Sequence, residues 1–133
     1  MTNLKNKTAL VIGGTSGIGK ATVSTLLAEG VNVHVVGRSI DKVADAAGIT
    51  KHRVDITNQS DVDSLTNEIS GLDNLDYLVN ASGIFGPKPF LDHTKEDYDS
   101  YLDLNRGFFF ITQSAAKNMK ETGGGSIENV GSL

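Results

Sequence analysis

The sequence predicts an α/β fold in which a doubly wound parallel sheet is covered by helices on both faces. Short apolar segments of strand character alternate along the chain with amphipathic segments of helix character. This alternation is typical of parallel strands joined by right-handed crossovers. A run of spaced glycines at 13–19 joins the first strand directly to the first helix, and no repeat or linker interrupts the pattern. We therefore expect one domain over residues 1–133.

Five strands and four helices are expected. The strands occupy residues 8–12, 31–36, 51–54, 76–80 and 126–130, and the helices occupy 17–29, 40–47, 59–70 and 95–120. Gly30 ends the first helix, and Ser39 or Asp41 caps the short second helix. Pro87 and Pro89 predict an irregular loop after the fourth strand. The expected strand order is 3-2-1-4-5, and ligands of such sheets bind at the carboxyl ends of the strands.

Composition predicts a soluble, cytoplasmic globular domain. The chain is 38% hydrophobic and 21% charged, which is close to the globular average. Its net charge is −4 without a cluster of Lys or Arg, which argues against nucleic-acid and membrane-surface partners. There is no cysteine for a disulfide or a thiolate metal site, and no apolar run long enough for a membrane span or a signal peptide. His34, His52 and His93 are scattered without ligand spacing, so we expect no metal site.

The segment from Val11 to Lys20 has the glycine spacing of a turn that holds nucleotide phosphates. Gly13 permits a tight turn, Gly17 lets backbone N–H groups approach a pyrophosphate, and Gly19 lets the following helix pack closely on the strand. An ordinary strand-to-helix loop is the alternative. The context favours nucleotide binding, because a strand precedes the glycines and a helix and a second strand follow them.

Five segments, in the same order, resemble the short-chain dehydrogenase/reductase family. They are the spacing Gly-x-x-x-Gly-x-Gly and residues 55–57, 78–84, 103–108 and 126–132. The resemblance implies a Rossmann-like dinucleotide-binding domain that takes part in hydride transfer between a nicotinamide cofactor and a carbonyl or secondary alcohol. Ile12, Ala81 and Ser82 depart from the Thr, Asn and Ala that are usual in the family.

The resemblance also assigns roles to particular residues. The cofactor-binding residues that it implies are Gly13, Thr15, Ser16, Gly17, Ile18, Gly19, Asp55, Ile56, Asn80, Ala81 and Gly83, and the catalytic residues are Asn105 and Ser132. In the family, the Asn breaks its helix locally and holds a water, and the Ser hydrogen-bonds the substrate oxygen. Asp55 would accept from the adenine amino group, or serve only as a loop or helix-cap carboxylate. Asn80 would also tie neighbouring strand ends together.

The cofactor is expected to be NADP(H). An NAD-binding domain carries a carboxylate about twenty residues after the glycine turn, to bind the ribose 2′-hydroxyl. This chain has Gly37, Arg38 and Ser39 there instead. A guanidinium can bind a 2′-phosphate through charge-assisted hydrogen bonds, which an acidic residue would oppose. The alternative makes Arg38 a solvated surface charge and Asp41 the ribose ligand of NAD(H).

The printed residues lack the Tyr-x-x-x-Lys motif that the family carries shortly after its Ser. None of Tyr77, Tyr98 and Tyr101 begins such a motif. We therefore expect a domain that is truncated after its fifth strand and is inactive when made alone. It is the cofactor-binding part of an NADP(H)-dependent oxidoreductase, an inactive nucleotide-binding or regulatory fragment, or a decayed gene product.

Two further expectations concern the end of the chain. Few helices cover the expected sheet, so we expect these residues not to form a well-behaved monomer: they form a homo-oligomer through the long helix near residues 108–111, aggregate, or exist only as part of a longer chain. Glu128 falls in the middle of the last strand, where an apolar residue is expected.

Overall fold

The computed structural model describes residues 3–84 and 86–131, which form a five-stranded parallel sheet in the order β3-β2-β1-β4-β5. The predicted fold class and strand order are therefore confirmed. Along the chain the elements are β1 (Thr8–Ile12), α1 (Gly17–Ala28), β2 (Asn32–Gly37), the 3-10 turn η1 (Ile40–Lys42), β3 (Ile49–Arg53), α2 (Gln59–Ser70), β4 (Tyr77–Asn80), the 3-10 turn η2 (Phe90–Asp92), α3 (Lys95–Glu121) and β5 (Ser126–Asn129).

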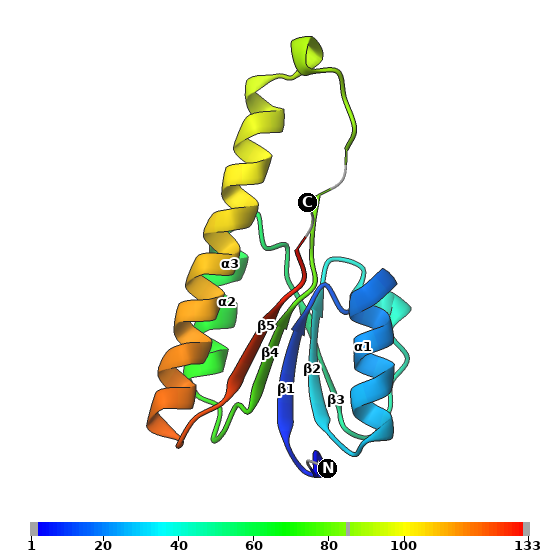
Figure 1. The fold of residues 1–133 in the computed structure, drawn as a ribbon, viewed down its shortest axis with the longest axis vertical. Helices are drawn as coiled ribbons and strands as arrows, with labels where there is room; N and C mark the ends of the chain where they lie inside the picture. Colours follow the sequence, from blue (N-terminus) through cyan, green and yellow to red (C-terminus); the bar gives the residue numbers. More distant parts are fainter. Residues whose placement is uncertain (1–2, 85, 132–133) are drawn as a thin grey trace.

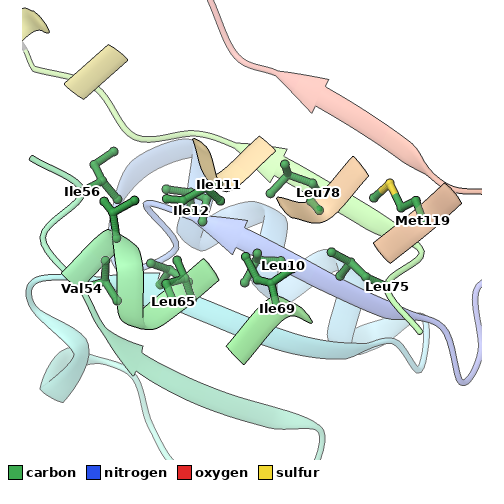
Figure 2. Packing of buried hydrophobic residues seen from close by; sticks show 13 residues of the cluster. Leu10, Ile12, Val54, Ile56, Leu65, Ile69, Leu75, Leu78, Ile111 and Met119 are labelled. Atoms are coloured by element: carbon green, nitrogen blue, oxygen red, sulfur yellow. The ribbon is translucent and has the colours of Figure 1, made fainter. Parts of the chain in front are cut away.

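The sheet separates two hydrophobic cores. Figure 1 shows α1 on one side of the sheet and α2 and α3 on the other. Because successive side chains of a strand point to opposite faces, Val11 packs toward α1, whereas Leu10 and Ile12 pack toward α2 and α3. Figure 2 shows the core between the sheet and helices α2 and α3. Its fully buried members include Leu10, Ile12, Leu65, Ile69, Leu75, Leu78 and Ile111.

Helix α3 extends well beyond the carboxyl edge of the sheet (Figure 1). Its start is fixed by a capping box, in which Thr94 accepts from the amide of Asp97 and the Asp97 carboxylate accepts from the amide of Thr94. In its middle, Gly107 lies against the loop after β3, where an added Cβ would come within 2.1 Å of the Ile56 carbonyl oxygen. Glycine is unfavourable inside a helix, so its presence here reflects this close packing.

Only β1 and α2 have the predicted bounds; α1, β2, β4, α3 and β5 differ by one residue at one or both ends, and the largest differences lie at residues 40–47 and in β3. Residues 40–47 form only the single turn η1, with Ser39 at the N-cap position but without a side-chain capping bond. Ile40 and Val43 pack into the α1-side core, but the residues that follow are exposed and have no surface on which a longer helix could pack. Strand β3 begins two residues before the predicted 51, because β2 already pairs with the chain at Gly48 and Ile49. Strand β5 ends at Asn129 rather than 130.

The position of Glu128 is explained by the sheet edge. Strand β5 is an outer strand of the described sheet, and Glu128 is exposed on it. Its carboxylate is therefore solvated, and no buried charge has to be compensated.

Two of the histidines are in contact, contrary to the expectation that they are scattered. His34 on β2 and His52 on β3 face α2, with His34 Nδ1 2.8 Å from His52 Nε2. His52 Nδ1 lies 2.9 Å from the Glu68 carboxylate on α2. Within residues 3–84 and 86–131, no group of three or more His, Asp or Glu side chains is arranged to hold a metal ion. The same residues include no helix with both the length and the apolarity needed to cross a bilayer.

His34 makes folding stability dependent on pH. Burial lowers the pKa of His34 below its ordinary value of 6.5, and the positive charge of His52 lowers it further, against an opposing effect of Glu68. Below pH 6.5 the unfolded chain therefore binds a proton more readily than the folded chain, and stability is lost as the pH falls through the folded pKa.

We expect the free energy of unfolding to decrease between pH 7 and 5 and expect His34→Gln to flatten this decrease. Urea unfolding at several pH values measures it, with the exposed His93→Gln as the control that keeps the wild-type slope. An unchanged slope in His34→Gln would show that another group is responsible.

Candidate functional site

A crevice of about 870 Å³ opens where the carboxyl ends of β1, β2, β3 and β4 meet. Its lining includes all of the cofactor-binding residues expected from the sequence except Gly19 and Asn80, namely Gly13, Thr15, Ser16, Gly17, Ile18, Arg38, Ser39, Asp55, Ile56, Ala81 and Gly83. These residues come from four separate segments of the chain, and Ser100 and Leu104 of α3 supply a fifth, so five segments converge on one hollow. Its volume lies within the range of small-molecule and cofactor sites.

The three predicted glycines have the geometry that a phosphate-binding turn requires. Gly13 has φ +78°, and its N–H donates to the Val36 carbonyl over 2.9 Å, which closes the turn onto β2. Gly17 has φ +53° and has open space where a Cβ would stand. Gly19 is packed so closely that an added Cβ would lie 2.0 Å from the Gly13 carbonyl oxygen. Gly19 therefore acts through packing, which explains why it does not line the crevice.

Two further glycines, which were not among the predicted residues, allow close packing between the glycine turn and β2. A Cβ at Gly14 would come within 2.7 Å of the Val35 side chain. A Cβ at Gly37 would come within 2.6 Å of the Thr15 side chain. At the end of β2, where an NAD-binding domain carries its carboxylate, the Thr15 side chain therefore occupies the space beside Gly37 in this chain.

The end of the crevice beside β2, called the β2 end below, carries basic side chains. Arg38 and Lys42 both line it, and Lys42 was not predicted from the sequence because it belongs to the turn η1 that follows the expected site. Asp41, which lies between them in sequence, is not among the lining residues. Its carboxylate instead pairs with Arg53 at 2.7 Å.

Asp55 is held as an ionised acceptor at the end of β3. Its Oδ1 accepts from the Thr57 hydroxyl at 2.7 Å and from the Thr57 amide at 3.0 Å. The pKa of Asp55 is lowered most by the hydrogen bond from the Thr57 hydroxyl. Burial raises the pKa, whereas the hydrogen bond from the Thr57 amide and the charge of Arg38 lower it further. Asp55 thus makes the loop contacts of the plainer interpretation while it also lines the crevice.

Asn80 and Asn105 lie at a second hollow, of about 510 Å³, beside the first. The Asn80 side chain is buried and donates to Thr112 on α3 at 3.1 Å and to Asn129 on β5 at 2.7 Å, so it ties neighbouring elements together as expected. Its Oδ1 has no hydrogen-bond partner among the described residues. The two hollows adjoin along the chain, because Ala81 and Leu104 line the crevice while Asn80 and Asn105 line the second hollow.

Of the two predicted catalytic residues, Asn105 and Ser132, the structure describes only Asn105. Helix α3 runs unbroken through Asn105, so the local break that the family resemblance implies is absent from this helix. Gly107 and Ile111 hold the next turns firmly against the β3 loop and the core, which favours continuous helix at this point. Ser132 lies outside the described residues.

A family model described as short chain dehydrogenase matches residues 7–133. The chain belongs to the short-chain dehydrogenase family. A relative in Staphylococcus haemolyticus, an uncharacterised oxidoreductase, is 31% identical over all of this chain and 61% of its own length. A 3α-hydroxysteroid dehydrogenase of Mediterraneibacter gnavus is 34% identical over 98% of this chain and 57% of its own length. The chain therefore spans about three fifths of the curated relatives that it matches.

A solved structure supports the same assignment. The short-chain dehydrogenase of Leptospira borgpetersenii with bound NAD+ is 27% identical and superimposes with a TM-score of 0.86, over 96% of this chain and 52% of that protein. Structures in this family thus include one with a nicotinamide dinucleotide. The Rossmann-like architecture expected of a short-chain dehydrogenase is the architecture that the described residues adopt.

We expect Gly19→Ala to destabilise this short-chain dehydrogenase by at least about 2 kcal/mol, because the new methyl group collides with backbone rather than with a movable side chain. Gly86→Ala is the control, since nothing lies within 4 Å of the added Cβ and its φ is not positive. Denaturant unfolding of both variants measures the difference. A wild-type unfolding free energy for Gly19→Ala would contradict the close packing of α1.

Proposed function

We propose that this short-chain dehydrogenase domain binds NADP(H) and serves an oxidoreductase that interconverts a carbonyl group and a secondary alcohol. In the reducing direction, the carbonyl carbon receives a hydride and its oxygen a proton, while the bound dihydronicotinamide is oxidised. The single observation that carries the cofactor proposal is the basic end of the crevice, where Arg38 and Lys42 line the hollow and Asp41, between them in sequence, does not.

The phosphate end of the crevice supports dinucleotide binding. The N-terminus of α1 opens into the crevice through Ser16, Gly17 and Ile18, and helix N-termini favour negatively charged groups. The open space at Gly17 leaves room for a ligand to approach the backbone. Asp55, which also lines the crevice, offers an ionised acceptor for the amino group of an adenine.

NADP(H) is favoured over NAD(H) by two features of the β2 end. The guanidinium of Arg38 and the ammonium of Lys42 can both pair with a 2′-phosphate. At Gly37, the position that would bear a ribose-binding carboxylate, an added Cβ would come within 2.6 Å of the Thr15 side chain, so a larger residue there requires Thr15 to move. NAD(H) is the alternative, since the Leptospira borgpetersenii structure has bound NAD+.

The proposal extends to partners of two kinds. A small carbonyl or alcohol is the substrate, in keeping with a relative named for a hydroxysteroid. A second copy of the chain is the other partner, docking on α3. Phe109, 63% exposed, and Phe110, 41% exposed, are the apolar residues available there. Ile111 is fully buried in the core, so it cannot belong to the interface that was expected near residues 108–111.

The cofactor proposal is tested by titrating the protein with NADPH and with NADH in a calorimeter. We expect NADPH to bind at least about tenfold more tightly, because charge-assisted bonds to the 2′-phosphate are absent with NADH. Arg38→Asp should narrow or reverse this difference. Arg106→Asp, the same charge change at an exposed position of α3 outside the crevice, should preserve it. Tighter binding of NADH by the wild-type protein would overturn the assignment.

A further inference from the structure

We propose that Arg53 is a positioning residue that sets the cofactor preference of this site, by holding Asp41 away from the place where a 2′-phosphate binds. The inference rests on the proposed NADP(H) site. Arg53 affects the cofactor preference through its neighbours and not by contact with the cofactor. Arg53 is not among the residues that line the crevice. It acts on the turn that carries Arg38 and Lys42.

The Arg53 side chain connects the ends of two neighbouring strands through hydrogen bonds. Arg53 is the last residue of β3 and stands opposite Gly37, the last residue of β2. Its Nη1 donates to the carbonyl oxygen of Arg38 over 3.1 Å, and its Nη2 donates to the carboxylate of Asp41 over 2.7 Å. One planar guanidinium therefore fixes both the backbone at Arg38 and the acidic side chain three residues later.

The pairing of Arg53 with Asp41 matters because Asp41 is an alternative ribose ligand. A carboxylate near the end of β2 would accept hydrogen bonds from the 2′-hydroxyl of NAD(H), and it would repel the 2′-phosphate of NADP(H). Asp41 lies between Arg38 and Lys42 in sequence, and its side chain is 83% exposed, so no packing restrains it. Arg53 both neutralises this carboxylate and directs it away from the two cations.

The contribution of this pair to folding is small. The Arg53 side chain is itself 58% exposed, and ion pairs between exposed groups add little to stability. Variants of either residue should therefore fold normally. A changed cofactor preference in such variants reports positioning rather than unfolding.

The test is the ratio of the dissociation constants for NADH and NADPH in Arg53→Gln. We expect this ratio to fall at least about fivefold, with NADPH binding weakened and NADH binding unchanged or strengthened. In the double variant Arg53→Gln/Asp41→Asn the ratio should recover most of the wild-type value, because the repelling charge is removed. Thermal unfolding should be close to wild type in both variants.

A matched control is available on the same strand. Lys51 pairs with the exposed Asp45 over 2.7 Å, and neither residue lines the crevice. Lys51→Gln therefore removes an ion pair of the same kind two residues from Arg53, and it should leave the ratio unchanged.

The outcomes separate this inference from the proposal on which it rests. A wild-type protein without a preference for NADPH would overturn both. A wild-type preference that Arg53→Gln leaves intact, or that Lys51→Gln reduces equally, would overturn the role of Arg53 alone. Failure of Asp41→Asn to restore the ratio in the double variant would also overturn it, because Asp41 would then not be the group that Arg53 holds away.

Discussion

The contact between the start of α1 and the turn after β1 is the constraint on which the rest of the structure depends. With no side chain at position 19, the helix lies directly against the Gly13 carbonyl, and any Cβ there would overlap it. Gly13 in turn hydrogen-bonds to the end of β2, so the turn is held from two sides. This arrangement brings the N-terminus of α1 to the carboxyl edge of the sheet, where the neighbouring strands also end. The crevice exists because the backbone can approach itself this closely.

The two ends of the crevice are built by different physical means. At the end formed by the glycine turn, the backbone of Gly13 and Gly17 and the N-terminus of α1 provide the surface together with Thr15, Ser16 and Ile18. At the β2 end, charged side chains provide the surface, since Arg38 and Lys42 line the hollow while Asp41 is paired with Arg53. The second hollow, with Asn80 and Asn105, meets the crevice along β4 and α3. The buried amide of Asn80 links these two elements to β5, so the region beside the crevice is tied together by side-chain hydrogen bonds.

Local sequence signals predicted most of the fold because each element has a clear period and a clear end. Helix α2 lies at the predicted residues, and β1 does as well. The prediction of a helix at 40–47 was wrong, because helix propensity does not show whether a surface exists on which a short helix can pack. The glycine turn followed from spacing, and Arg38 and Ser39 from their place after the second strand, whereas the remaining cofactor residues were expected from the family resemblance. The contacts of Arg53 with Asp41 and of His34 with His52 could not be predicted, since both depend on the register between β2 and β3, which one sequence does not specify.

The central claim is that the β2 end of this crevice selects a ribose bearing a 2′-phosphate. The most direct measurement compares the affinities of adenosine 2′,5′-bisphosphate and adenosine 5′-monophosphate by calorimetry at low and high salt, because the two ligands differ only in that phosphate. We expect the bisphosphate to bind at least about tenfold more tightly at low salt, with a difference that narrows as salt screens Arg38 and Lys42. Equal affinities at low salt would contradict the claim.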